Sequence, residues 1–349
     1  MADRVGVSPS TVSAVLNDSP RARSFFPETK ERVRVAAQEL GYCPNPLAKT
    51  LKRNRSGVVG AVLFSQHSFY YGPPLWAAEK SAKELGYEIV TADMGYDPGR
   101  LPQCLQSLAA WRTEGLLLFT GGHRLAESEM RAIQDMGVPF VRAGTRRADE
   151  PCSSLVFNNF GAGRSLALHL AQLGHRRIGV IAANASNEQS EERVAGILAA
   201  LKASGADLSP GRLIRARDHD VGIGAGYRYT AEMLELSPDL TALVCLNDGM
   251  AVGALRRLWE LGRRVPKDIS VTGFDDVWLG PEPSDENRLG PYLTPALTTI
   301  RAPLEMVGGE AMRMLVEMLR DDGARRVKRV VEFLPELVIR ESTGPVPQG

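Results

Sequence analysis

Short apolar runs alternate with segments of helical periodicity from Gly57 onward, and this alternation constrains the fold more than any other feature of the chain. A strand–helix–strand order of this kind predicts a parallel sheet with helices on both faces. The apolar runs predicted to be strands in the first part are 58–64, 88–92, 115–119 and 139–143. The chain from Gly57 is therefore predicted to be of the α/β class.

The pattern starts again near Gly161, with strands predicted over 177–182, 213–217, 242–246 and 269–274. Two α/β units in series, each built on a doubly wound parallel sheet, are similar to the periplasmic sugar-binding fold, which binds its ligand between two lobes. Ligands of such sheets lie beyond the carboxyl ends of the strands. We therefore expect the binding residues in the loops that follow the predicted strands.

The segment Val5–Asn17 has the pattern of a helix-turn-helix instead. Gly6 permits a tight turn, Ser8 can cap a helix and Pro9 suits the first helical position. The apolar face of this helix is predicted to be Val12, Val15 and Leu16. The small, mostly polar side chains expected to face outward are Ser10, Thr11, Ser13, Ala14 and Asn17. Such a second helix enters the major groove of DNA; the alternative is an ordinary capped surface helix.

Charge is distributed unevenly along the chain. Residues 1–56 contain ten Lys or Arg and five Asp or Glu, while the net charge of the whole chain is +1. The first 56 residues are therefore basic and the remaining residues slightly acidic. A basic head suits binding to DNA phosphates; a solvated run of charge near the terminus is the alternative.

A second periodic run over Thr29–Leu40 and the corner Gly41-Tyr42-Cys43-Pro44-Asn45-Pro46 follow in order. With Val5–Asn17, they resemble the lactose-repressor/galactose-repressor (LacI/GalR) family of bacterial transcription regulators, and the resemblance continues over nearly the whole chain. It implies that Leu51, in a hinge helix, wedges into the minor groove. The DNA-binding residues that it implies are Ser8, Pro9, Ser10, Thr11, Ser13, Ala14, Asn17, Thr29, Tyr42, Asn45, Lys49 and Leu51.

Three features depart from the family pattern. Residues that form most of the family's first helix are missing before Met1, so we expect a GTG valine codon to have been read as the start and the true N-terminus to lie upstream. Ala14 stands where family members often carry an arginine that reads guanine. The loop 17–29 is longer than in the family and contains Arg21 and Arg23. We expect part of the base readout to have moved to this loop.

The resemblance also implies an effector site, in which Arg193, Asn247 and Asp275 form a polar clamp. An arginine fork, an amide and a carboxylate together satisfy vicinal hydroxyls or ring nitrogens. Phe69 and Tyr71 lie where the family places an aromatic ring against the ligand, although core packing explains either one equally well. A sugar is the expected effector from its frequency in the family alone; a purine or another small metabolite would suit the same residues.

The resemblance predicts a helix-turn-helix head at 1–43, with an incomplete first helix, followed by a hinge helix and linker at 44–56. The N-terminal lobe is predicted at 57–157 plus about 300–326, and the C-terminal lobe at 158–299 plus about 327–342. A tail at 343–349 completes the chain as given. An insertion near 279–290 is rich in Gly, Pro and acidic residues and is predicted to be a loop. It begins beside Asp275 and either covers the ligand pocket or extends into solvent. Asp248 is expected to cap the helix that follows it.

Other functional classes find little support in the sequence. The four cysteines are widely spaced, which argues against zinc and against a disulfide framework. The five histidines show no metal spacing, and no Ser/His/Asp set or nucleotide loop with the required context is present. No signal peptide and no run of about 18 apolar residues appears. We therefore predict no catalytic residues, no cofactor, no metal and no membrane contact.

The predicted function is that of a cytoplasmic, homodimeric transcription regulator, a repressor, that binds operator DNA and responds allosterically to a small-molecule effector. Two alternatives remain. The first is a small-molecule sensor without a working DNA-binding head, which salt-dependent DNA binding would exclude. The second is an enzyme on the same scaffold, which turnover of a bound sugar would reveal.

Overall fold

The structure is a computed structural model that describes residues 1–16, 20–42, 55–144, 152–206, 211–218, 220–280, 282–321 and 328–347. The chain forms two compact units, Met1–Ser56 and Gly57–Gly349. The predicted DNA contacts that lie outside the described residues are Asn17, Asn45, Lys49 and Leu51. Most of the predicted hinge is outside them as well.

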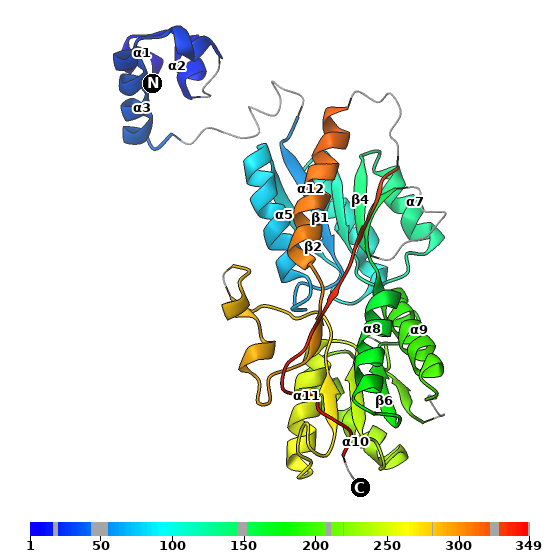
Figure 1. The fold of residues 1–349 in the computed structure, drawn as a ribbon. Helices are drawn as coiled ribbons and strands as arrows, with labels where there is room; N and C mark the ends of the chain where they lie inside the picture. The colour runs from blue at the N-terminus through cyan, green and yellow to red at the C-terminus, as the bar shows by residue number, and fades with distance from the viewer. Residues whose placement is uncertain are drawn as a thin grey trace. The chain divides into compact units, whose positions relative to one another are not determined.

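The smaller unit is a helical head (Figure 1), and its helices share one small apolar centre. Its elements are α1 (Ala2–Val5), α2 (Pro9–Leu16), the 3₁₀ helix η1 (Pro20–Ser24) and α3 (Pro27–Glu39). The side chains buried at its centre are Val5, Val15, Val33 and Ala36. Gly6 ends α1 at a φ of 66°, a conformation that glycine adopts without steric cost, and so turns the chain toward α2. The predicted helix-turn-helix is therefore present.

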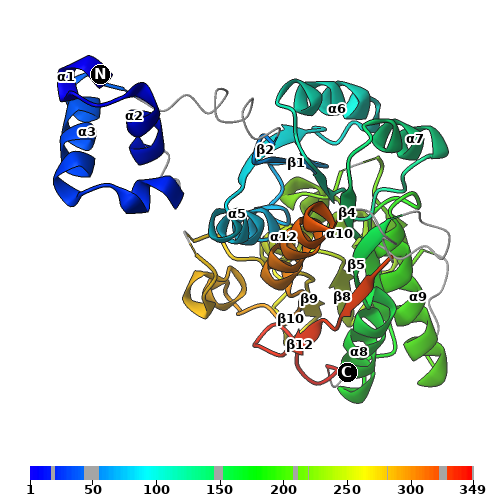
Figure 2. The same cartoon turned by 90° about the horizontal axis from the view of Figure 1, so that it is seen from above.

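The first lobe of the larger unit is built on a parallel sheet of order β2-β1-β3-β4-β5-β11. Its strands are β1 (Val58–Leu63), β2 (Glu88–Asp93), β3 (Leu116–Phe119), β4 (Phe140–Gly144), β5 (Ser153–Phe157) and β11 (Val330–Phe333). Its helices are α5 (Gly72–Leu85), α6 (Leu101–Ala110), α7 (Glu127–Asp135) and α12 (Leu304–Arg320). Figures 1 and 2 show α5 and α12 together on one face of the sheet, with α6 and α7 on the other.

The second lobe contains a parallel sheet of order β7-β6-β8-β9. Its strands are β6 (Ile178–Ala182), β7 (Leu213–Arg215), β8 (Ala242–Cys245) and β9 (Ser270–Thr272). Its helices are α8 (Asn159–Gln172), α9 (Glu188–Ala203), α10 (Ile223–Leu236) and α11 (Asp248–Glu260). Val180 packs in the cluster under α8 and α9, while Ile181 packs in the cluster under α10 and α11. Because successive side chains of a strand point to opposite faces, the two helix pairs cover both faces of the sheet.

The glycine-rich segment 222–226 has a packing role in this lobe. A Cβ atom on Gly226 would lie 2.0 Å from the carbonyl oxygen of Met250, and one on Gly253 would lie 2.0 Å from that of Ile223. The two glycines therefore allow α10 and α11 to approach with their backbones in contact. Close helix packing therefore accounts for Gly226 without a bound nucleotide.

One predicted boundary is wrong. The sequence pattern identified a strand near 327–334 and the resemblance assigned it to the second lobe, but β11 pairs in parallel with β5 of the first lobe. The chain then crosses to the second lobe, where β12 (Glu336–Val338) pairs antiparallel with β10 (Thr299–Arg301). Apolar alternation marks a strand but does not say which sheet edge it joins, which explains the error.

Candidate functional site

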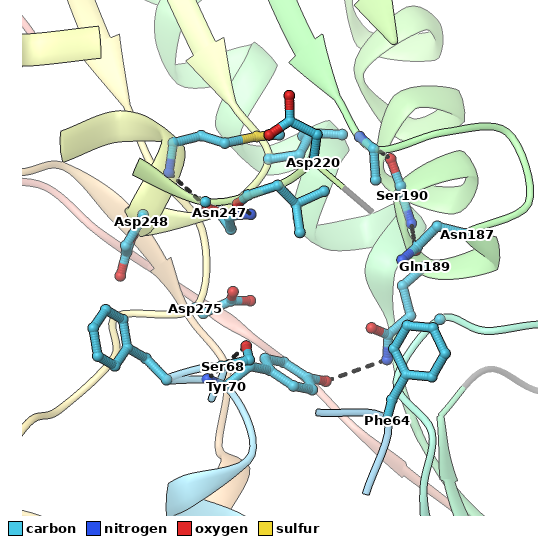
Figure 3. Close-up of a pocket in the computed structure, with 18 of the residues that line it drawn as sticks. Phe64, Ser68, Tyr70, Asn187, Gln189, Ser190, Asp220, Asn247, Asp248 and Asp275 are labelled. Atoms are coloured by element: carbon cyan, nitrogen blue, oxygen red, sulfur yellow. Dashed lines mark hydrogen bonds between the residues drawn. The ribbon is translucent and has the colours of Figure 1, made fainter. Parts of the chain in front are cut away.

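A cavity of about 330 Å³ lies between the two lobes of the larger unit. Its walls come from segments after β1, β2 and β3 of the first lobe and after β6, β7, β8 and β9 of the second. The cavity thus lies at the carboxyl ends of the strands, where a parallel α/β sheet places its ligands. Figure 3 shows polar side chains from the second lobe facing Phe64 and Tyr70 from the first lobe.

Arg193 and Asp275 form a buried ion pair at the wall of this cavity. The Arg193 guanidinium donates from Nη2 to Oδ1 of Asp275 over 3.1 Å, and both side chains are at most 7% exposed. Its other nitrogens donate to Oδ1 of Asn159 and to the carbonyl oxygen of Leu246, at 3.0 and 2.8 Å. The guanidinium also lies 3.8 Å from the ring centre of Phe274. Burial raises the pKa of Asp275, and the charge of Arg193 opposes this rise.

Asn247, rather than Asp248, caps the helix that follows them. Asn247 is the N-cap of α11, since its Oδ1 accepts from the backbone N–H of Met250 over 2.7 Å. Its amide also donates to the carbonyl oxygen of Val221. The prediction that Asp248 caps the helix is therefore wrong. Its carboxylate instead accepts from Oγ1 of Thr299 at 2.6 Å and from the backbone N–H of Val277 at 3.0 Å.

Three aromatic residues in sequence, Phe69, Tyr70 and Tyr71, reach the cavity from the first lobe. Phe69 is 48% exposed, so it is not a core residue, whereas Tyr71 is 6% exposed and also packs in the first core. Tyr70 connects the lobes because its hydroxyl accepts from Nε2 of Gln189 over 3.2 Å (Figure 3). Desolvation of the phenol, followed by the nearby charge of Asp275, raises the pKa of Tyr70 to about 12.

All five predicted effector residues line this one cavity, although they come from widely separated parts of the chain. Sequence reasoning missed several further polar residues there. These are Asn184, Asn187, Gln189, Ser190, Asp218 and Asp220. All of them follow β6 or β7, so the rule that ligands bind at strand carboxyl ends was the signal that would have found them.

The pH dependence of stability is expected to report on Asp248. Burial, followed by the charge of Asp275, raises its pKa from 3.8 to about 8. Between these values the folded chain binds a proton that the unfolded chain releases, so this carboxyl makes stability fall as pH rises, by up to about 1.4 kcal/mol per pH unit. Urea unfolding of the wild type and of Asp248→Asn from pH 4 to 8 measures this slope, and the variant is expected to show a shallower decline. Asp239→Asn, at an exposed carboxyl, is the control and should keep the wild-type slope. If the stability of Asp248→Asn fell with pH as steeply as that of the wild type, the raised pKa of Asp248 would be contradicted.

The head presents most of its predicted DNA-binding residues on its surface. Ser8, Pro9, Ser10 and Ser13 are exposed, Thr11 and Thr29 are half-buried, and Tyr42 is 49% exposed. Ala14 is 8% exposed and is therefore buried within the head, so its placement on the outward face was wrong. Ala14 and the neighbouring Val15 are the two buried residues of α2.

Two further features bear on function. Among the residues that the structure describes, no group of three His, Cys, Asp or Glu side chains is placed to hold a metal ion. No helix in the same part of the chain is long and apolar enough to cross a membrane.

A helix-turn-helix head joined to a two-lobed domain with an interlobe cavity defines a ligand-responsive DNA-binding regulator. The bacterial regulatory proteins of the lacI family match residues 1–45, and the periplasmic binding protein-like domain matches residues 167–343. HTH-type transcriptional repressors PurR are similar over 99% of this chain and 96% of their own length. The identity is 31% for the repressor of Serratia proteamaculans and 32% for that of Pectobacterium carotovorum subsp. carotovorum.

Solved structures of transcriptional regulators are also similar to this chain. The lac repressor dimer bound to operator and the anti-inducer ONPF is 27% identical, with a TM-score of 0.80 over 98% of this chain and 97% of that one. A complex of the transcriptional regulator CelR with cellobiose is 28% identical, with a TM-score of 0.72 and 98% of both chains covered. The chain belongs to the lacI family of bacterial regulatory proteins. It is a transcriptional repressor of this family and carries an effector-binding domain.

Proposed function

We propose that the chain acts in the cytoplasm as a homodimer that represses transcription from a pseudo-palindromic operator and is controlled by a sugar bound between its lobes. The observation that supports the control mechanism best is the interlobe cavity, because a ligand there contacts both lobes at once. A ligand with different affinities for two lobe arrangements shifts the equilibrium between them, and its coupling to DNA binding is reciprocal. No covalent chemistry is required of the site.

The chemistry of the cavity favours a ligand with many hydrogen-bond donors. Arg193 already uses three of its nitrogens on Asn159, Leu246 and Asp275. Asp218 and Asp220 line the cavity in addition to Asp275, and the Asp220 carboxylate is paired with Arg228. Ionised carboxylates only accept hydrogen bonds, so their best partners are groups such as sugar hydroxyls.

The aromatic side chains of the cavity add a second preference. Phe69 is 48% exposed while lining the cavity, and Phe64 and Tyr96 lie in the same wall with their rings in T-shaped contact. Flat apolar surfaces of this kind suit the C–H face of a pyranose ring. The similarity to a regulator solved with cellobiose supports the same ligand class.

Calorimetric titration of the full chain distinguishes the ligand classes. Cellobiose and glucose serve as sugar probes, and hypoxanthine serves as the purine probe. We expect saturable binding of a sugar with a change in operator affinity of roughly 5- to 150-fold, the usual range of allosteric coupling. Binding of hypoxanthine with no response to sugars would replace the sugar by a purine and leave the repressor mechanism in place.

The 3₁₀ helix η1 is expected to contribute to DNA affinity. It exposes Arg21 and Arg23, whereas Arg4 of the same unit is engaged with Glu39 over 2.7 Å. Each arginine that contacts a phosphate adds about 0.9 to the slope of log affinity against log salt. Replacing both Arg21 and Arg23 by alanine should lower this slope by up to about two and weaken DNA binding. Fluorescence anisotropy over a salt series measures the slope. Arg131→Ala, which removes an exposed arginine from α7 in the larger unit, is the control. An unchanged slope in the double variant would contradict the contact.

A further inference from the structure

The insertion after Asp275 folds into a short hairpin, which comprises residues 277–280 and 282–289. The backbone N–H of Leu279 donates to the carbonyl oxygen of Asn287 over 2.8 Å, and that of Leu289 donates to the carbonyl oxygen of Val277 over 2.9 Å. Trp278 and Arg288 face each other across the hairpin as an antiparallel bridge. The insertion was predicted to be a loop that either covers the pocket or extends into solvent. In Figures 1 and 2 it is the gold segment next to α5.

The hairpin contacts the first lobe although it grows from the second. Trp278 is 8% exposed and packs edge-on against Trp76 of α5, with ring centres 6.1 Å apart and an interplanar angle of 85°. Nη2 of Arg288 lies 3.5 Å from Oε1 of Glu305, which is in the first turn of α12. Both α5 and α12 belong to the first lobe, so the hairpin joins the two lobes through an aromatic contact and an ion pair.

Arg288 also contacts Asp276, a buried carboxylate of the second lobe. Asp276 is 0% exposed and is surrounded by three arginines. Their shortest nitrogen–oxygen distances to it are 3.7 Å for Arg288, 2.8 Å for Arg301 and 2.8 Å for Arg340. Arg288 donates as well to the backbone carbonyl of Asp276 over 2.6 Å. A buried charge must be paired to be tolerated, so these arginines fix the position of Asp276.

The backbone at this point is strained. Asp275 and Asp276 have φ values of 100° and 47°, which are costly for residues other than glycine. Such a conformation persists only where its surroundings hold it. Here the backbone N–H of Asp275 donates to the carbonyl oxygen of Ile300 over 2.7 Å, and Arg288 donates to the backbone carbonyl oxygen of Asp276. Arg288 of the hairpin thus holds the residue that follows Asp275, while Asp275 itself is held by Arg193 and by the carbonyl oxygen of Ile300.

We propose that the hairpin is a positioning element of the effector site, in which Arg288 holds Asp275 in place through Asp276, while Trp278 and Arg288 tie the second lobe to the first. On the far side of the cavity, the backbone N–H of Glu188 donates to the carbonyl oxygen of Gly122 over 2.8 Å, which also joins the lobes. The hairpin thus sets how readily the lobes separate and release a ligand. The consequence for effector affinity rests on the function proposed above.

Hydrogen exchange of the full chain, without DNA or ligand, tests the proposal. Two variants separate the two roles. Glu305→Gln removes only the interlobe ion pair, whereas Arg288→Ala also releases Asp276. The matched control is Arg264→Ala, because this exposed arginine pairs with Asp268 of its own lobe over 2.7 Å. The amides followed are those of Glu188 and Asp275, and folding of each variant is checked by circular dichroism.

We expect both Glu305→Gln and Arg288→Ala to speed exchange at Glu188, by roughly fivefold or more, although neither residue touches it. Only Arg288→Ala should speed exchange at Asp275. Unchanged exchange at Glu188 in Glu305→Gln would overturn the interlobe tie, and unchanged exchange at Asp275 in a folded Arg288→Ala would overturn the positioning role. Because the assay contains neither DNA nor effector, its failure is distinguishable from a failure of the repressor proposal.

Discussion

Replacing Arg193 by alanine is expected to lower the free energy of unfolding by about 3–5 kcal/mol, since it leaves the buried carboxylate of Asp275 without its partner. The substitution also leaves the Leu246 carbonyl oxygen without the hydrogen bond from Nη1 and removes the cation–π contact with Phe274. Response to any effector should disappear because the wall of the cavity loses its fixed geometry. Chemical denaturation of the larger unit, followed by its change in fluorescence, measures the loss.

Two controls make this result specific. Arg212→Ala removes an arginine whose partner, Asp239, has a 53% exposed side chain, and a pair of that kind contributes at most about 1 kcal/mol. The double variant Arg193→Ala, Asp275→Ala removes both charges and should be more stable than Arg193→Ala alone, because the uncompensated charge is gone. A loss in Arg193→Ala no larger than that in Arg212→Ala would contradict the importance of the buried pair.

Replacing Ser13 by proline should abolish specific DNA binding. Ser13 is an exposed residue in the interior of α2, where proline removes a helical hydrogen bond and clashes with the preceding turn, at a cost of about 3 kcal/mol. The helix predicted from the sequence to enter the major groove would then be broken. Operator affinity should fall to the level of random DNA, a loss of about a thousandfold or more. Electrophoretic mobility shift with specific and random duplexes measures this ratio.

Ser13→Ala is the matched control, since alanine favours the helix and removes only the hydroxyl group. Its loss of affinity should be far smaller than that of Ser13→Pro. Ligand binding by the larger unit should be the same in both variants, because the two units are separately compact. Specific operator binding by Ser13→Pro at wild-type strength would show that α2 does not read the DNA.

Much of the architecture could be predicted from the sequence because it depends on local patterns. Short apolar runs located the strands of the two parallel sheets except β5 (Ser153–Phe157), and Gly6, Ser8 and Pro9 marked the turn and the start of α2. Arg193 and Asp275 were expected in one clamp although 82 positions separate them, and the structure places them in contact. Whether the cavity that they line binds the effector is the subject of our proposal.

The remaining features depend on contacts between distant segments, which local patterns do not encode. The sheet joined by β11 is decided by pairing with β5. Asn247, rather than Asp248, caps α11 because Thr299 and Val277 engage the Asp248 carboxylate. The role of the insertion was undecided because its composition indicates a loop, whereas Trp278 meets Trp76 only in the folded domain. Ala14 was misplaced because one turn of periodicity leaves the edge of a helix face ambiguous.

The most direct test of the central claim is the affinity of the full chain for DNA against salt concentration, measured with a duplex selected from its own genome and with random DNA. The account predicts specific binding of two chains per duplex, stronger than random binding by about a thousandfold or more, and weakened when a sugar or another effector occupies the larger unit. Equal, weak affinity for selected and random DNA at every salt concentration would contradict it. The chain would then be a ligand-binding sensor whose head does not read DNA.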